Sequence, residues 1–317
     1  MRRFRERMKS CMAISGTLYQ YLWFFMIYGF LGWVLEVVYQ AVSQGLVVNR
    51  GFLNGPICPI YGVGMVGVLC LLGQYASGGA QENLPLLFLL GTLLATLVEL
   101  AGGWALDRLF HTRWWDYSQK PFHFRGYICL EFSLIWGLAI LVAADEIHPW
   151  VRDQIVARIP LLPGMILLGV VYAVFLTDLV LTVVMLTRMR RYLEELEEVQ
   201  GRLRAVSDKL TEVIGGTTLK TARKVGEGQV QAALGRAELM ESVNERYTAY
   251  RREMEQKRAE LQQRADSIYE RLLSRNVLSA RRMLEAFPGL RSHDHTELME
   301  NLKQRWSALA RRMGNDN

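Results

Sequence analysis

The first half of the chain alternates long apolar runs with short polar or broken stretches. An apolar run of roughly 20 residues is long enough to cross a bilayer as a helix. Five runs reach or approach this length, and they cover about 18–42, 57–77, 84–106, 127–146 and 161–186. The pattern therefore predicts an all-α, polytopic helical membrane protein with about five transmembrane helices.

The stretch between the first two runs is too apolar for a solvated loop and too broken for a helix. It reads RGFLNGPICPIYG over residues 50–62, and its prolines and glycines forbid a regular helix. Non-helical backbone at membrane depth survives only where protein or a water-filled cavity satisfies it. We interpret residues 51–62 as a re-entrant or cap-like lead into the second helix, facing a polar space. Three glycines of the second run predict close helix packing: Gly62, Gly64 and Gly67.

After Leu186 the apolar positions recur in alternating steps of three and four. This heptad spacing predicts a coiled coil that continues the fifth span and associates with a helix of the same or a second chain. The seam consists of Met189, Tyr192, Leu196, Val199, Leu203, Val206, Leu210 and Val213. We expect Gly215-Gly216 to interrupt it. A second helical run over about 229–286, closed by Phe287-Pro288-Gly289, and a last helix over about 296–312 should follow.

These patterns predict a basic N-terminal extension (1–17), a transmembrane domain (18–186) and a helical coiled-coil tail (187–317). The tail holds 25 Lys and Arg against 20 Asp and Glu, and so carries five of the six net positive charges. Basic residues flank both membrane faces almost equally, so the positive-inside rule does not orient the chain. We expect an N-terminus outside and a cytoplasmic tail at the cell membrane, because a long charged tail is more easily retained than translocated. The basic extension favours the opposite orientation.

Composition and the absence of known motifs argue against several classes of function. No basic run is interleaved with aromatics, so we expect no nucleic-acid partner. The four cysteines form no CxxC pair, which speaks against a zinc pattern or a disulfide framework. Phosphate-loop, GxSxG and HExxH motifs do not occur. We therefore expect no cofactor or metal, and a role other than that of an enzyme is favoured. A metal site remains an alternative, with Cys58, Cys129, His111 and His123 as its ligands.

Four acidic residues lie within the apolar runs, namely Glu36, Glu99, Glu131 and Asp178. A charge inside a bilayer is unfavourable, so such residues face the bundle interior or water. Successive spans alternate in direction, and a helix rises about 1.5 Å per residue. Counting from the span ends then places all four carboxylates roughly 6–12 Å from the same membrane face. The broken stretch reaches that face as well.

The sequence thus predicts a polar site or vestibule open to one side, for a cation, a proton or a polar head group. Its candidate residues are Glu36, Arg50, Asn54, Cys58, Tyr61, Glu99, Asp116, Arg125 and Glu131. The alternative is a set of buried ion pairs that fix helix packing, such as Glu36 with Arg50 and Glu131 with Arg125. In that case Asp178 would simply bond its neighbours Thr177 or Thr182.

Several motifs resemble one known family. The stretches GWVLEVVY, GFLNGPICPIYG, RWWDYS and GYICLEFSLIWG occur in this order, and over about 18–186 the chain is similar to the CmpB-like family of bacterial ABC-transporter permeases. The resemblance implies a permease subunit in the bilayer whose ATPase is a separate chain. It supplies no substrate and no catalytic residue. Two alternatives stay open: a membrane-anchored scaffold or sensor working through its tail, and an intramembrane enzyme acting on a lipid head group through Asp116 and Glu131.

Overall fold

The computed structural model describes residues 2–45, 47–76, 84–224, 233–274, 280–292 and 294–315. The chain forms two compact units. The first comprises Met1–Thr187 together with Ala280–Thr296, and the second comprises Arg188–Ser279 together with Glu297–Asn317. The segment from Ala280 to Thr296, which lies in the tail by sequence, therefore clusters with the apolar runs. We call this segment the return segment.

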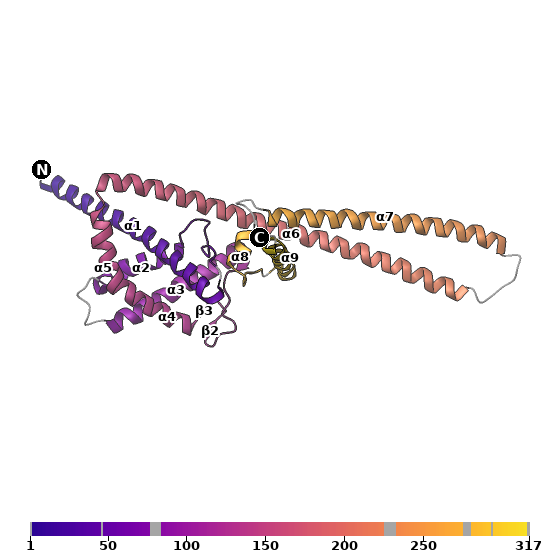
Figure 1. The fold of residues 1–317 in the computed structure, drawn as a ribbon, viewed down its shortest axis with the longest axis horizontal. Helices are drawn as coiled ribbons and strands as arrows, with labels where there is room; N and C mark the ends of the chain where they lie inside the picture. The colour runs from indigo at the N-terminus through magenta and orange to yellow at the C-terminus, as the bar shows by residue number, and fades with distance from the viewer. Residues whose placement is uncertain are drawn as a thin grey trace. The chain divides into compact units, whose positions relative to one another are not determined.

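The first unit is built mainly from helices (Figure 1). These are α1 (Arg2–Gln44), α2 (Pro59–Ala76), α3 (Leu84–Phe110), α4 (Leu130–Val142), α5 (His148–Trp150), α8 (Arg281–Ala286) and the first part of α6 (Leu161–Lys224). Four two-residue strands accompany them: β1 (Thr112–Arg113), β2 (His123–Phe124), β3 (Ile128–Cys129) and β4 (Arg291–Ser292). β1 pairs antiparallel with β4, and β2 pairs antiparallel with β3. The return segment thus contributes a strand to the loop that follows α3.

Three of the described helices are long and apolar enough to cross a membrane. They contain the segments Thr17–Ser43, Leu84–Phe110 and Leu161–Lys209, and a shorter apolar helix covers Pro59–Leu72. The fourth predicted span corresponds to α4, which has 13 residues and is followed by a π-helical segment. The chain is therefore a mostly helical membrane protein, and the count of five spans stays a prediction.

Close approach of α1 and α2 depends on two glycines. A Cβ on Gly62 would lie 2.6 Å from the carbonyl oxygen of Phe25, and one on Gly32 would lie 2.2 Å from Cγ of Tyr61. Close packing was predicted for Gly62 but not for Gly32. A Cβ on Gly64 would meet nothing within 4 Å, so the prediction fails there. Small residues let helix backbones approach in lipid, where dispersion contacts drive association.

The apolar core of the first unit lies at one end of its helices. Residues of α1, α2, α3 and the first part of α6 meet there: Trp23, Phe24, Tyr28, Met65, Val68, Leu69, Leu72, Leu87 and Leu168. The chain after α4 packs against them through Ala144, Val151 and Val156. We call this end of the unit the apolar end.

The chain between α4 and α6 remains helical but changes its winding. Two π-helical segments, Ala143–Ile147 and Val151–Ile155, flank α5, and a 3₁₀ turn follows at Val156–Arg158. π-helical turns re-aim side chains and often mark functional positions. Here they turn His148 into the core, where the Tyr28 hydroxyl lies 3.2 Å from its Nδ1.

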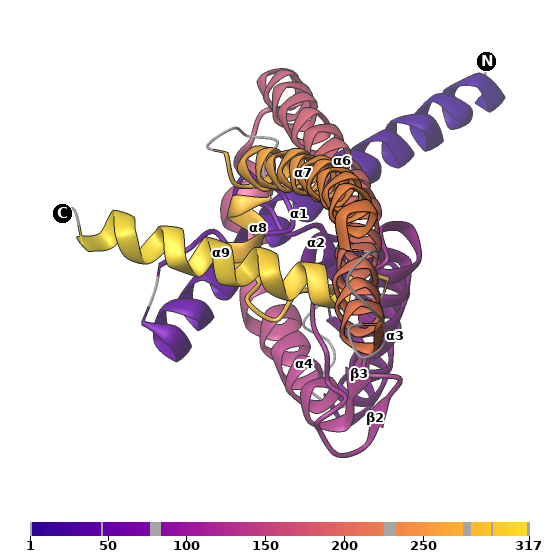
Figure 2. The same ribbon diagram turned by 90° about the vertical axis from the view of Figure 1, so that its right-hand side faces the viewer.

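The second unit contains the later part of α6, α7 (Ala233–Leu273) and α9 (Thr296–Asn315). α6 and α7 lie side by side in both views (Figures 1 and 2), and Arg264 Nη2 lies 2.7 Å from Glu195 Oε1 between them. Arg305 of α9 pairs with Asp266 of α7 at 2.9 Å. Buried apolar residues fill the space between the helices: Leu193, Leu196, Val199, Ile268, Leu272, Leu298 and Leu302.

The structure corrects two expectations about the tail. α6 continues through Gly215-Gly216 to Lys224 instead of ending there. The helical run predicted over about 229–286 is not continuous, because α7 ends at Leu273 and α8 begins anew at Arg281. α8 does end before Phe287, as predicted. Met189, Leu196 and Val199 of the heptad seam are buried, whereas the side chains of Leu210 and Val213 lie outside the described residues. Self-association through this seam stays a prediction.

Candidate functional site

The broken stretch after α1 is held in place by a carboxylate from a distant helix. Residues 47–58 are non-helical, and α2 begins at Pro59. Asp178 of α6 accepts hydrogen bonds from the Asn54 backbone at 3.2 Å, the Asn54 side chain at 2.8 Å and the Gly55 backbone at 2.7 Å. Of the neighbours considered from sequence, Thr177 donates to the Ala173 carbonyl oxygen and Thr182 accepts a hydrogen bond from the Asn54 side chain at 3.3 Å, whereas Asp178 binds the broken stretch. It satisfies backbone donors that the break leaves without helical partners.

A second set of bonds fixes the start of the same stretch. The Trp33 indole donates to Asn49 Oδ1 at 2.7 Å, and the Asn49 side chain donates to the Asn54 carbonyl oxygen at 2.6 Å. At the other end, the Cys58 N–H donates to the Gly29 carbonyl oxygen at 2.9 Å. The stretch is thus a folded element that closes against α1 and α6, and protein groups satisfy its backbone as membrane depth requires.

Glu36 of α1 faces this element. The Tyr61 hydroxyl donates to Glu36 Oε1 at 2.7 Å, and Arg50 Nε lies 3.5 Å from Glu36 Oε2. The Glu36 and Arg50 side chains are 25% and 27% exposed, so water reaches the pair. Arg50 also lies over the ring of Tyr39 at 5.2 Å. Three predicted site residues, Glu36, Arg50 and Tyr61, therefore meet.

Glu99 of α3 is buried, with 7% of its surface exposed. The Tyr117 hydroxyl donates to its Oε1 at 3.0 Å, and the Trp136 indole interacts with the same carboxylate. Oε2 has no partner within hydrogen-bond geometry in the described structure, so the Trp136 contact is a weak one. Among the described residues, Glu99 forms no ion pair with Lys, Arg or His.

Tyr117 is the hydroxyl donor to Glu99. Its ring stacks on Phe132 with centroids 4.9 Å apart. Burial and the negative charge of Glu99 raise the pKa of Tyr117 far above its ordinary value, and Glu36 adds to this effect. Tyr117 therefore stays protonated and acts as a hydrogen-bond donor. Sequence analysis noted Tyr117 only within RWWDYS, because nothing in the local pattern indicates which carboxylate a tyrosine will reach.

Glu131 lies at the surface instead of in the bundle. Its side chain is 49% exposed and pairs with Lys120 at 3.0 Å. The suggested pair of Glu131 with Arg125 is therefore wrong. Arg125 has a positive φ of 51° in the turn between β2 and β3, which directs its side chain outward over Phe124. Arg125 does not join the other candidate residues.

A further acid, Asp107, was missed in the sequence because it lies beyond the third apolar run. It is buried, accepts a hydrogen bond from the Tyr127 hydroxyl and lies 3.4 Å from Arg113 Nε. The Arg113 guanidinium also covers the Tyr127 ring at 4.9 Å. Hydrogen bonding to Asp107, together with burial, raises the pKa of Tyr127. This cluster joins the end of α3 to the chain before α4.

Asp116 belongs to the neighbouring turn. It accepts a hydrogen bond from the Ser118 backbone at 3.0 Å and pairs with Arg291 at 3.2 Å. Burial alone would raise the pKa of Asp116, but the bond from Ser118 and the positive charges of Arg113 and Arg291 outweigh it and lower the pKa. Asp116 and Glu131, the acid and base of the hypothetical lipid enzyme, therefore lie in separate ion pairs.

The return segment contacts both the broken stretch (residues 47–58) and the loop that follows α3. Arg282 donates to the Gly51 carbonyl oxygen at 2.8 Å and to the Phe52 carbonyl oxygen at 2.9 Å. Burial lowers the pKa of Arg282, and the negative charge of Asp178 opposes this shift. Phe287 packs edge-on against Trp114 with centroids 4.8 Å apart.

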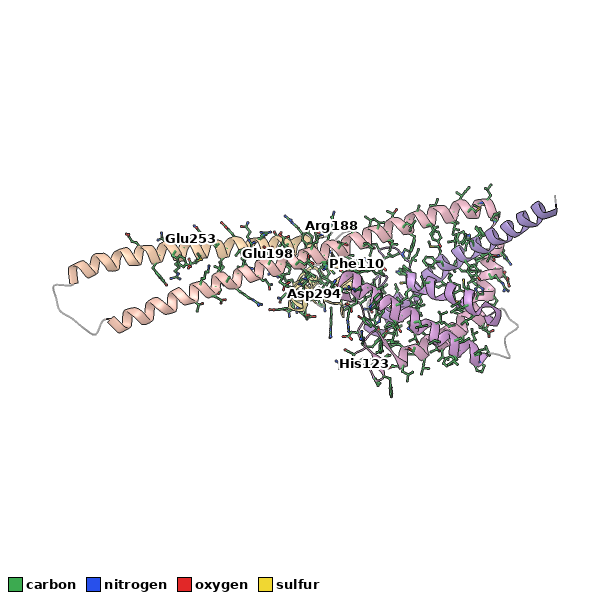
Figure 3. All side chains as sticks on the ribbon, turned by 180° about the vertical axis from the view of Figure 1, so that it is seen from behind. Phe110, His123, Arg188, Glu198, Glu253 and Asp294 are labelled. Atoms are coloured by element: carbon green, nitrogen blue, oxygen red, sulfur yellow. The ribbon has the colours of Figure 1, made fainter. Side chains whose placement is uncertain are left out.

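The same segment is joined to the end of α3 by a contact between a histidine and an aspartate and by a pair of strands. His111 Nδ1 lies 2.9 Å from Asp294 Oδ2, and β1 pairs with β4. Figure 3 shows Phe110 and Asp294 close together, with His123 farther away on the β2–β3 hairpin. We call residues 47–58, 111–129 and the return segment, with the carboxylates they contact, the polar end. No sequence signal pointed to the return segment as part of it.

Within the described residues, no group of three or more His, Cys, Asp or Glu side chains could hold a metal ion. Cys58 and Cys129 are buried free thiols, and His123 pairs with Cys129 across the β2–β3 hairpin. His111 instead pairs with Asp294. The four residues proposed from sequence as metal ligands therefore do not form one ligand cluster in the described structure.

One family model matches residues 23–183 and is described as a putative ABC-transporter type IV. The chain belongs to this family. The match to the CmpB family includes Glu36, Glu99, Glu131 and Asp178, together with the broken stretch, and it ends before the return segment. The resemblance expected from the sequence motifs is therefore confirmed. No solved structure matches the chain.

Proposed function

We propose that this chain is the membrane-spanning permease subunit of an ABC-type transporter and that a separate protein supplies ATP hydrolysis. The proposal is supported by membership of the CmpB family and by the apolar helices that carry the acids. We further propose that the chain lies in the cell membrane, with its N-terminus outside and its tail in the cytoplasm. The polar end would then face the cytoplasm.

The observation that carries a transport site is the environment of Glu99. Among the four acids, Glu36 has Arg50 beside it, Glu131 has Lys120, and Asp178 satisfies the backbone of the broken stretch. These contacts explain three acids as structural groups. Glu99 is buried without a cationic partner among the described residues. A buried carboxylate without a cation either takes up a proton or binds a cation.

The neighbours of Glu99 suit such a role. Tyr117 donates to one carboxylate oxygen and leaves the second available for a proton or a cation. The negative charges of Glu99 and Glu36 both raise the pKa of Tyr117, so Tyr117 stays a protonated donor to Glu99. We propose that a proton or a small cation reaches Glu99 from the polar end.

The test is infrared difference spectroscopy of the full-length protein in lipid nanodiscs as pH and cation concentration change. Titration of Glu99 should give a carboxylic-acid carbonyl band that Glu99→Gln removes, while Glu131→Gln leaves it intact. Gln preserves the acceptor for Tyr117, so the protein should stay folded. A band that persists in Glu99→Gln would refute the site at Glu99.

The transport role needs its own test. The full-length protein, purified from native membranes under mild conditions, should bring with it a protein with a phosphate-binding loop and ATPase activity. Glu99→Gln should leave this association unchanged but uncouple ATP hydrolysis from solute movement in proteoliposomes. Absence of any such ATPase at stoichiometric amounts would argue against the permease role while leaving the ligand site at Glu99 open.

One observation favours the second candidate, a membrane-anchored sensor. The return segment ties the C-terminal region of the chain to the broken stretch through Arg282. A tail that binds a partner could thereby alter the polar end. Deletion of residues 280–317 distinguishes the roles: a sensor would lose its output altogether, whereas a permease would retain cation or proton binding at Glu99.

A further inference from the structure

Strand β2 and the residue directly before it present two aromatic side chains to their surroundings. Phe122 is 82% exposed and Phe124 is 55% exposed. Phe122 has a positive φ of 53°, a conformation that bulky residues rarely adopt. An unfavourable backbone conformation persists only where the surrounding structure holds it in place. The fold therefore holds Phe122 in this conformation, with its side chain exposed.

Strand pairing and contacts to the turn explain how this local structure is maintained. His123 pairs with Cys129 and Phe124 pairs with Ile128 in antiparallel register. The Tyr117 N–H donates to the Gly126 carbonyl oxygen at 2.9 Å. The Trp115 indole donates to the carbonyl oxygen of Tyr127 at 2.8 Å. The hairpin is therefore a fixed element, in which Phe122 lies directly before β2 and Arg125 lies in the turn after it. We call residues 122–125 the tip.

The hairpin lies directly beside a lipid-facing surface. β3 leads without a loop into α4, whose first residue, Leu130, is 49% exposed. Leu134 and Leu138, one and two turns further along α4, are 42% and 57% exposed. An apolar stripe of this kind on a membrane protein faces acyl chains, and its beginning at Leu130 places the hairpin at the bilayer surface.

Positive charge accompanies the two aromatic rings. Among the described residues the Arg125 guanidinium pairs with no carboxylate, and it lies 5.8 Å from the centre of the Phe124 ring. Lys120 is partly neutralised by Glu131, so Arg125 provides the uncompensated charge of the tip. Aromatic side chains and arginine together are suited to the boundary between acyl chains and phosphates.

We propose that residues 122–125 form an anionic-lipid contact, in which Phe122 and Phe124 insert into the membrane interface and Arg125 binds a lipid phosphate. The partner is a lipid because the apolar tip continues the lipid-facing stripe of α4 and carries a cation at its rim. Anionic head groups attract basic residues near the surface.

The experiment places a nitroxide label at the tip of the full-length protein in nanodiscs. Phe122→Cys is labelled in a background with Cys11→Ala and Cys70→Ala, and the same background without a new cysteine controls for labelling of the buried thiols. Gln119→Cys, an exposed polar position in the turn before β2, gives the aqueous reference. Leu138→Cys gives the acyl-chain reference. Collision rates with oxygen and with a water-soluble nickel chelate report the depth.

We expect the label at position 122 to lose most of the nickel collisions measured at position 119 and to gain oxygen collisions toward the level at position 138. Free collision with the nickel chelate would place the tip in water and overturn the proposal. Protection from both reagents would mean that protein covers the tip, as in a protein–protein interface, and would overturn it equally.

The role of Arg125 is tested by lipid composition. In discs containing phosphatidylglycerol, the label at position 122 should lie deeper than in discs of phosphatidylcholine alone, and Arg125→Gln should abolish this difference. Arg152→Gln is the matched control, because Arg152 is bound to its neighbour Asp153 and lies on the segment between α4 and α6. Equal depth in the two lipids, or a difference that survives Arg125→Gln, would overturn the phosphate contact.

Discussion

The two ends of the first unit are stabilised by different forces. At the apolar end, continuous helices bury aromatic and aliphatic side chains, and the hydrogen bond between Tyr28 and His148 is a minor addition. At the polar end, the backbone is broken between α1 and α2, and carboxylates and guanidinium groups satisfy it. The comparison shows that polar residues gather where the chain leaves the helix altogether, whereas the π-helical turns at the apolar end bury Ala144 and Val151.

This comparison also separates the acids by role. A carboxylate that satisfies backbone groups, as Asp178 does, or one that pairs with a cation, as Glu36 does, has a structural explanation. Glu99 belongs to the polar end but has neither kind of partner among the residues that the structure describes. Glu99 is therefore the acid of the polar end for which these contacts give no structural explanation.

The largest effect is expected at the apolar end. Phe24 is 5% exposed and packs edge-on against His148 at 4.8 Å. Phe24→Ala should lower the free energy of unfolding by about 3 kcal/mol, the lower limit for core phenylalanines in soluble proteins, because lipid also solvates the ring. Thermal or denaturant unfolding in detergent measures it. Phe30→Ala is the control, since Phe30 is 45% exposed and should change little; equal losses would contradict the packing argument.

The next effect concerns the carboxylate that holds the broken stretch. Asp178→Ala removes the acceptor for Asn54 and Gly55 and should destabilise the protein by about 2–3 kcal/mol. Hydrogen exchange at residues 51–58 should rise in parallel. Thr177→Ala is the matched control, because Thr177 bonds only within its own helix. Unchanged exchange in Asp178→Ala would show that the stretch does not depend on α6.

A smaller effect is expected from the return segment. Arg282→Gln removes the charged donor to the Gly51 and Phe52 carbonyl oxygens and should lower stability by about 1.5–2 kcal/mol. The control is Arg281→Gln, because Arg281 pairs with Glu285 one turn along the same helix and such pairs contribute about 0.3–0.5 kcal/mol. Faster hydrogen exchange at residues 51–58 in the first variant alone would support the contact, and equal exchange in both would refute it.

The smallest effect concerns Glu36 and Arg50. Because about a quarter of each side chain is exposed, their coupling in a double-mutant cycle should be about 0.5–1 kcal/mol. The cycle compares Glu36→Gln, Arg50→Gln and the double variant by thermal stability. Single losses of about 3–5 kcal/mol that the double variant recovers would identify a truly buried pair and would give Glu36 a larger packing role than its exposure indicates.

Local patterns in the sequence determined several features of this protein. The apolar runs indicated the long helices, and two prolines with their flanking glycines located the break before α2. The break itself follows from backbone chemistry, since proline lacks the N–H that a helix needs. Alternation of the spans was enough to expect Glu36, Glu99 and Asp178 near the same loops, and the structure connects each of them to residues of those loops.

Partner choice depended on tertiary structure. Lys120, not Arg125, reaches Glu131 because the left-handed backbone at Arg125 turns its side chain away. Gly32, not Gly64, makes the close contact with a neighbouring helix because helix rotation decides which face meets α1 or α2. Arg282 reaches a loop 231 residues earlier in the chain. Sequence spacing fixes depth and period along one helix, whereas rotation of a helix about its axis and the return of a distant segment emerge only when all packing contacts are satisfied together.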